Sequence, residues 1–139
     1  MSAIDQTLNE IVEEFELIGD RDAQYEYVIE LGKALPRLSP AEQTEANALR
    51  GCASPAWLVT EPQADGTIVF RGDSEAVIPR GIIGVLLRLY SGRTPAEILA
   101  FDAREGLARL GLSNMLSMSR ANGLASMVAR IRADAERAA

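Results

Sequence analysis

The hydrophobic pattern at the start of the chain is helical. Between residues 3 and 18, apolar side chains recur every three or four positions and acidic side chains occupy the opposite face, which predicts an amphipathic helix. Gly19 and Asp20 interrupt this pattern. A second helix is predicted from Asp22 to Leu35, and Pro36 ends it because proline cannot continue the helical hydrogen bonds.

The middle of the chain changes to a strand pattern. Residues 56–61 and 67–72 are rich in β-branched and aromatic side chains, and Asp65-Gly66 between them is a strong turn signal. The sequence therefore predicts a β-hairpin. Residues 73–77 are expected to add a short third strand or an edge.

The second half returns to helices. Residues 79–91 are apolar nearly all round, so this helix is predicted to lie at the centre of the core. Residues 94–97 combine a capping box with proline at the first helical position, which indicates the start of a short helix. A further helix is expected from Asp102 until Gly111, and a last one over residues 119–136.

Length and composition are those of one ordinary soluble domain. The chain has 139 residues, of which 47% are hydrophobic and 24% charged. We therefore expect a single domain over residues 1–139 with an α+β fold, in which helices cover a small antiparallel sheet of about three strands. No apolar run approaches the ~20 residues of a membrane span. The start of the chain does not resemble a signal peptide, and a single cysteine cannot form an internal disulfide, so a cytoplasmic protein is expected.

The charge distribution argues against a nucleic-acid partner. The formal net charge is −6, whereas nucleic acid favours clustered Lys and Arg. Residues 1–30 hold nine carboxylates against Arg21 alone. This acidic region is either a solvated helix face or a surface that steers a basic protein partner.

Much catalytic chemistry is missing from the sequence. The chain has no histidine and only one cysteine, which leaves no Ser-His or Cys-His pair and no cage of metal ligands. No phosphate-binding glycine loop is present, because Gly81 and Gly84 fall within the apolar helix, where close packing explains them better. We therefore expect neither a metal nor a cofactor, and Cys52 is the candidate for chemistry.

Cys52 lies at the end of a long loop, directly before the first predicted strand. Gly51 permits a turn and Pro55 stiffens the segment, so the thiol is expected at a loop tip. The alternative is a small buried apolar residue, which is the commoner role of a lone cysteine. A nearby Arg50 would favour the thiolate, and a thiolate without a base suits sulfur exchange better than amide hydrolysis. Trp57 is expected to bury most of its ring.

Blocks of sequence over nearly the whole chain resemble one protein family. They are Tyr25-Glu26-Tyr27-Val28-Ile29-Glu30-Leu31-Gly32-Lys33-Ala34-Leu35-Pro36, Gly51-Cys52-x-Ser54-x-x-Trp57-Leu58-Val59, Gly72-Asp73-Ser74-Glu75-Ala76 with Gly81-Ile82, Leu89-Tyr90-Ser91-Gly92-Arg93-Thr94-Pro95, and a final group of Leu112, Leu116, Ser117, Ser119-Arg120-Ala121-Asn122-Gly123-Leu124 and Met127. In this order they resemble the motifs of the SufE family.

The resemblance implies a sulfur-transfer protein of iron–sulfur cluster assembly. Such proteins accept sulfane sulfur as a cysteine persulfide from a SufS-type cysteine desulfurase, stimulate that enzyme, and pass the sulfur to a SufB-containing scaffold complex. The acceptor falls on Cys52, and the family fold is α+β and related to the scaffold protein IscU. The PLP belongs to the desulfurase, so no cofactor is expected here and Lys33, the only lysine, needs no such role. The chain would be a persulfide carrier and activator rather than a stand-alone enzyme; a homodimer stays open.

The cysteine motif departs from the family pattern Gly-Cys-Gln-Ser-Gln-Val-Trp at two positions. Ala53 and Pro55 replace the two glutamines, which affects partner choice and loop motion rather than the thiol. Residues expected to support Cys52 or bind the partner are Arg50, Gly51, Ser54, Glu75 and Arg120. For Arg120, a place near the cysteine loop and a purely structural capping role both stay open.

Two alternative functions remain at this stage. The chain could activate a desulfurase by docking alone, with sulfur carriage secondary. It could also relay sulfur to a pathway other than cluster assembly, as in a CsdE-like protein. A Cys52→Ser variant separates the first alternative from a carrier, since a pure activator would still bind and stimulate.

Overall fold

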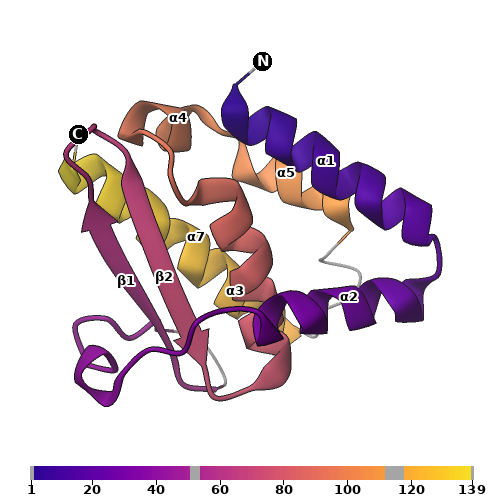
Figure 1. Ribbon diagram of the computed structural model, residues 1–139, viewed down its shortest axis with the longest axis horizontal. Helices are drawn as coiled ribbons and strands as arrows, with labels where there is room; N and C mark the ends of the chain where they lie inside the picture. Colours follow the sequence, from indigo (N-terminus) through magenta and orange to yellow (C-terminus); the bar gives the residue numbers. More distant parts are fainter. Residues whose placement is uncertain (1, 51–53, 112–117, 139) are drawn as a thin grey trace.

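Six α-helices and a two-stranded antiparallel sheet make up the described part of this α+β chain (Figure 1). The computed structural model describes residues 2–50, 54–111 and 118–138, with backbone only for residues 118–120. The elements in order are α1 (Ala3–Ile18), α2 (Arg21–Lys33), the 3₁₀ turn η1 (Pro40–Glu42), β1 (Ala56–Pro62), β2 (Ile68–Ser74), α3 (Val77–Tyr90), α4 (Pro95–Ala100), α5 (Ala103–Leu110) and α7 (Met118–Ala138).

Local signals place the ends of the first two helices. The hydroxyl of Ser2 accepts a hydrogen bond from the backbone N–H of Asp5, which satisfies a free donor at the start of α1. Gly19 has a φ of 73° and ends the helix. Asp20 then caps α2 by accepting from the N–H of Ala23. The observed bounds of both helices lie within two residues of the prediction.

The predicted hairpin is confirmed. β1 pairs with β2 in antiparallel register, from Ala56 opposite Ser74 to Pro62 opposite Ile68. Gly66 takes a φ of 89° in the connecting turn, a conformation that glycine adopts at little cost.

The predicted third strand over residues 73–77 is wrong for the described chain. β2 continues through Ser74, and α3 already begins at Val77, two residues earlier than expected. Only Ala76 and Val77 of this stretch are apolar, so the hydrophobic pattern does not mark where the strand ends and the helix begins. Instead, an isolated bridge between Ala48 and Trp57 extends the pairing on the outer edge of β1.

Helix α3 lies at the centre of the core, as predicted. Figure 1 shows it between the hairpin on one side and helices α1 and α5 on the other. Its residues Leu86, Leu89 and Tyr90 are fully buried. Ala56 and Leu58 face the core, and Trp57 between them is partly buried, so the expectation that most of its ring is buried stays a prediction.

Glycines allow α2 and α3 to cross at close range. A Cβ atom added to Gly81 would lie 2.4 Å from the carbonyl oxygen of Val28, and one added to Gly32 would lie 2.5 Å from the backbone nitrogen of Gly81. Both distances are too short for a carbon atom, so close packing explains these glycines, as the sequence indicated for Gly81. In the described part of the chain, no helix is long and apolar enough to cross a membrane.

Candidate functional site

Two paired backbone segments flank the cysteine in the sequence. The N–H of Leu49 donates to the carbonyl oxygen of Ala56 at 2.8 Å, and the N–H of Leu58 donates to that of Asn47 at 2.8 Å. Residues 50–55 connect these two paired segments. Gly51, Cys52 and Ala53, which the sequence singles out, lie outside the described residues. The predicted position of the thiol at a loop tip therefore stays a prediction.

On both sides of Cys52 a backbone carbonyl is bound by a serine hydroxyl. The carbonyl oxygen of Pro55 accepts from Oγ of Ser74 at 2.8 Å and from the N–H of Glu75 at 3.2 Å. The carbonyl oxygen of Arg50 accepts from Oγ of Ser126, on α7. The described ends of the cysteine segment are thus held by two different parts of the fold.

A buried carboxylate lies directly behind Ser74. Asp73 is 1% exposed, and its Oδ1 accepts from the N–H of Ser74 at 2.8 Å. Its Oδ2 accepts from Nε of Arg37 at 3.0 Å and from the N–H of Leu38 at 3.1 Å. Nε of Arg80 lies 3.1 Å from Oδ1 as a further ion pair. Asp73 therefore ties the long loop, the end of β2 and the start of α3 together.

The residues predicted to support Cys52 occupy different positions. Arg50 and Glu75 are exposed and Ser54 is partly buried. Glu75 contacts the far end of the segment, because its backbone N–H donates to the carbonyl oxygen of Pro55. Arg120 lies on α7, but its side chain is outside the described residues. The structure thus brings Glu75 to the cysteine segment, while the role of Arg120 stays open.

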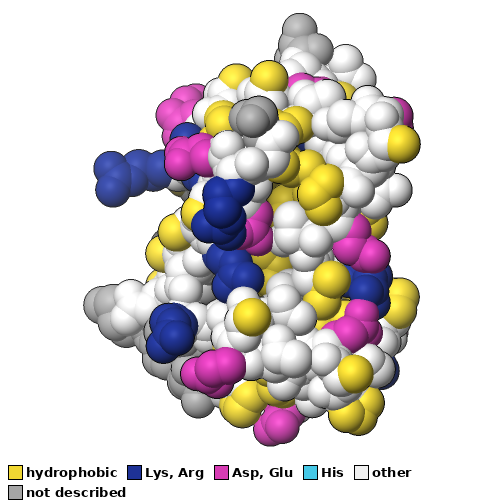
Figure 2. Space-filling view, turned by 90° about the vertical axis from the view of Figure 1, so that its left-hand side faces the viewer, with side chains coloured by type: hydrophobic (Ala, Val, Ile, Leu, Met, Phe, Trp, Pro, Cys, Tyr) yellow, Lys and Arg dark blue, Asp and Glu magenta, His cyan; other side chains and the backbone are white. Residues whose placement is uncertain are grey.

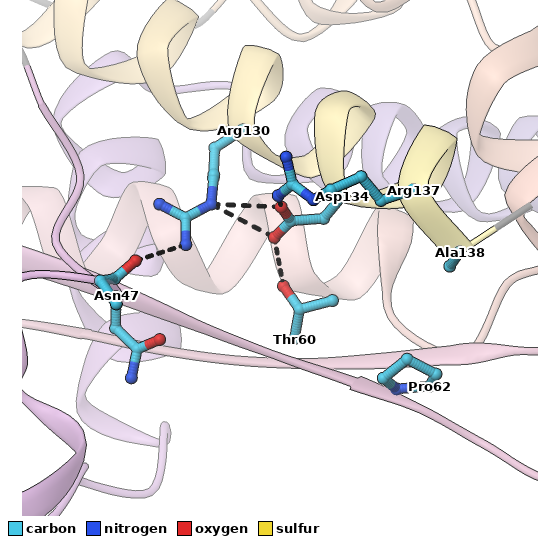
Figure 3. Close-up of a pocket in the computed structure, with 8 residues that line it drawn as sticks. Asn47, Thr60, Pro62, Arg130, Asp134, Arg137 and Ala138 are labelled. Carbon is cyan, nitrogen blue, oxygen red and sulfur yellow. Dashed lines mark hydrogen bonds and ion pairs between the residues drawn. The ribbon is translucent and has the colours of Figure 1, made fainter.

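A polar hollow of about 360 Å³ lies between α7 and the edge of β1 (Figure 3). Asp134, which is 6% exposed, accepts from Oγ1 of Thr60 at 2.6 Å and pairs with Nε of Arg130 at 3.3 Å and with Arg137. Nη2 of Arg130 donates to the carbonyl oxygen of Ala46 at 2.7 Å. Since these charged groups hold α7 against β1 and the preceding loop, we assign the cluster a structural role.

Figure 2 shows the face on which β1 and the loop before it lie, with several Lys and Arg side chains on one half of it. On the loop side, Glu42 and Arg71 form an ion pair. The hydrogen bond from Arg71, together with that from the backbone of Ser39, lowers the pKa of Glu42 to about 2. This pair fixes η1 to β2.

The described residues contain no group of three or more His, Cys, Asp or Glu side chains that could hold a metal ion. A second hollow, of about 420 Å³, is mainly apolar and lies between the end of α2, β2 and α3, with Leu35, Phe70 and Leu87 among its lining residues. Lys33 is exposed and pairs with Glu30 at 3.4 Å on the surface of α2.

Sequence reasoning missed Asp73, Ser74 and Ser126 as individual contributors. Asp73 and Ser74 belong to a block that the sequence marks only as a whole, whereas Ser126 carries no signal beyond its place on the polar side of α7.

Comparison with known proteins gives a consistent result. The family model SufE, described as an Fe-S metabolism associated domain, matches residues 9–135. An uncharacterised SufE-like protein from Rhizobium etli is 46% identical over 133 residues, which cover 94% of this chain and 90% of the relative. An uncharacterised SufE-like protein from Rhizobium meliloti (strain 1021) is 40% identical over 133 residues, covering 94% and 95%.

A solved structure shares the fold. The solution structure of a hypothetical protein from Thermus thermophilus superposes with a TM-score of 0.78 and covers 95% of each chain. At 18% sequence identity, this likeness supports the fold alone.

Proposed function

The chain belongs to the SufE family, a family associated with Fe–S metabolism, and on this premise we propose that it carries sulfur as a persulfide on Cys52 for iron–sulfur cluster assembly. One observation carries the proposal: the only cysteine lies inside the region matched by the family, between two backbone segments that pair with each other. The donor is a SufS-type cysteine desulfurase, and the receiver is a SufB-containing scaffold complex.

The transfer step is thiol exchange on sulfur. The thiolate of Cys52 attacks the terminal sulfur of a persulfide on the desulfurase, and a new S–S bond forms as the old one breaks. The desulfurase cysteine leaves as a thiolate, and the terminal sulfur keeps its proton. No external oxidant or reductant is needed, because one S–S bond replaces another.

This step requires little acid–base machinery from the chain. The thiolate is the reactive form of cysteine and a strong nucleophile. A cysteine therefore reacts at neutral pH even when only a small fraction of it is ionised. The chain lacks histidine, and Arg50, two residues before the thiol, supplies a positive charge that would raise the thiolate fraction if it lies close. Sulfur abstraction from cysteine belongs to the PLP of the desulfurase.

The test is intact-mass analysis after incubation with the desulfurase, PLP and cysteine. We expect the mass of the chain to increase by sulfur that a reductant removes. The Cys52→Ser variant is the matched control and should gain none. An unchanged wild-type mass, while the desulfurase turns over faster, would contradict carriage.

Activation by docking alone is the second candidate function. Glu75, whose backbone N–H binds the Pro55 carbonyl, is exposed, and Val77 at the start of α3 is 53% exposed. Because both side chains follow the end of β2 that binds the cysteine segment, a desulfurase docked at that segment would contact them. If docking alone activates, the Cys52→Ser variant will stimulate the desulfurase as well as the wild-type chain does.

A further inference from the structure

The outer edge of β2, on the side away from β1, is paired over only part of its length. Alternate residues of an antiparallel strand direct their backbone N–H and carbonyl groups to the same edge. The N–H of Ile68 donates to the carbonyl oxygen of Arg93 at 2.8 Å, and the N–H of Phe70 donates to Oγ of Ser91 at 3.0 Å. The segment that follows α3 therefore covers the first two positions of this edge.

Gly72 is the next residue of β2 that faces this edge. It lies opposite Leu58, whose N–H donates away from β2 to the carbonyl oxygen of Asn47, so the two strands exchange no hydrogen bond at this pair. Gly72 is buried, and among the described residues no hydrogen bond reaches its N–H or its carbonyl oxygen. Since buried backbone groups are paired in the great majority of cases, this open donor and acceptor point to a binding partner.

The open position lies at an apolar hollow. Gly72 is one of the residues that line the hollow of about 420 Å³ between the end of α2, β2 and α3. The apolar side chains of this lining come from Leu31, Ala34, Leu35, Pro36, Phe70 and Leu87. Ala34 and Pro36 are exposed, so the hollow is open to solvent.

The direction of a side chain at this position is given by the strand. A Cβ atom added to Gly72 would lie 2.7 Å from Cγ2 of Ile83 and 3.8 Å from Cδ1 of Leu87, so this face of β2 is turned towards α3. Residues directly opposite each other in an antiparallel pair place their side chains on the same face. A residue paired with Gly72 from outside would therefore direct its side chain towards α3 and the hollow.

The charges around the hollow are mainly negative. Two arginines line it and each is paired with two glutamates, namely Arg71 with Glu42 and Glu61, and Arg88 with Glu10 and Glu14. Four carboxylates thus accompany two guanidinium groups. This excess of negative charge favours a partner with basic groups beside its apolar one.

We propose that the hollow beside Gly72 binds a short extended segment of a partner protein, in which an apolar residue is flanked by lysine or arginine. A single extended residue can exchange both hydrogen bonds with Gly72. Its side chain then enters the hollow, as in the addition of a strand to an exposed sheet edge. The pairing is limited to about one residue, because Ser91 and Arg93 cover the preceding positions. The proposal does not depend on sulfur carriage.

The test follows peptide binding to the nitrogen-15-labelled full chain by NMR. The probe is the capped peptide acetyl-Lys-Thr-Leu-Thr-Lys-amide, and we expect saturable shifts of the Gly72 amide and of amides around the hollow. Methylation of the leucine nitrogen removes one donor and should weaken binding about five-fold. Alanine in place of leucine should weaken it at least about ten-fold, because the apolar contact is lost. Glutamate in place of both lysines should weaken it about five-fold.

A matched pair of protein variants locates the site. Ala34→Leu adds an apolar side chain to the wall of the hollow and should weaken binding about ten-fold by excluding the leucine of the peptide. Ala100→Leu makes the same change at an exposed position of α4, outside the lining, and should bind as wild type does. Should Ala34→Leu not fold, the peptide series on the wild-type chain still decides the matter.

Several results would overturn the proposal. They are an unmoved Gly72 amide, equal weakening in Ala34→Leu and Ala100→Leu, and unchanged affinity of the methylated peptide. Equal affinity of the glutamate peptide would rule out a basic partner. A last arm uses anilinonaphthalene sulfonate, an apolar anion without a peptide backbone. If this probe moves the same amides and the peptide does not, the hollow is a small-molecule site and not a site for a protein segment.

Discussion

Removal of the buried Asp73 carboxylate should be the most damaging single change near the cysteine segment. In Asp73→Ala, the Arg80 guanidinium loses its ion pair in a site where its side chain is only 13% exposed. The buried N–H of Leu38 loses its acceptor as well. Removing one member of a buried ion pair costs about 3–5 kcal/mol, because the remaining charge stays desolvated.

The two arginines around Asp73 should contribute unequally. The side chain of Arg37 is 63% exposed, so water replaces its partner and Arg37→Ala should cost less than about 1 kcal/mol. A double variant, Asp73→Ala with Arg80→Met, removes the charge that Asp73→Ala leaves unpaired. It should recover part of the lost stability, since apolar residues often replace a buried pair at little cost.

Urea unfolding followed by circular dichroism at neutral pH measures these free energies. The control is Glu30→Ala, which removes the exposed pair with Lys33 and should change the free energy of unfolding by less than about 0.5 kcal/mol. A loss of about 3–5 kcal/mol is a large share of the total stability of a small domain, about 5–15 kcal/mol. A cost below about 1 kcal/mol for Asp73→Ala would refute the reasoning.

Three further predictions concern other parts of the fold. Gly81→Ala should destabilise the chain by about 1–3 kcal/mol, because the new methyl group clashes with the carbonyl oxygen of Val28. Thermal unfolding measures this loss, and an unchanged midpoint would contradict it. The pKa of Glu42 is lowered from 4.5 to about 2. Its pairing with Arg71 therefore stabilises the fold above pH 4.5, and this stabilisation is lost as the pH falls towards 2. Unfolding curves of the wild type and of Glu42→Gln should converge at about pH 2. Burial raises the pKa of Tyr90 to about 12, and its hydroxyl has no hydrogen-bond partner among the described residues. Tyr90→Phe should therefore leave the free energy of unfolding unchanged or raise it by up to about 1 kcal/mol. A clear loss of stability would show that the hydroxyl has a partner.

The sequence predicts an element well where local chemistry decides its ends. Ser2 and Gly19 alone account for the observed bounds of α1, and Thr94 with Glu97 forms the predicted capping box of α4. Gly66 likewise takes the positive φ that the turn signal indicated. These features depend on residues close together in the chain, so they are visible in a single sequence.

Contacts between distant segments were not predictable in the same way. The bridge of Ala48 to Trp57 gives the outer edge of β1 a partner from within what the sequence predicts as a loop. Pairing of this kind depends on where the chain folds back, which hydrophobic periodicity does not encode.

The candidate site shows the same division between local and distant information. The nucleophile is visible from residue type alone, because Cys52 is the only thiol and lies between Gly51 and Pro55. The hydroxyl that holds the start of its segment comes from Ser126, far along the chain, and a serine on a helix has no feature that distinguishes an anchor from a solvated side chain. Ser126 and Arg130 lie one turn apart on α7, but polar residues at this spacing are equally typical of a solvated helix face. The residue proposed for sulfur exchange can thus be identified from the sequence, whereas the residues that fix its backbone become recognisable only once the fold brings carbonyls to them.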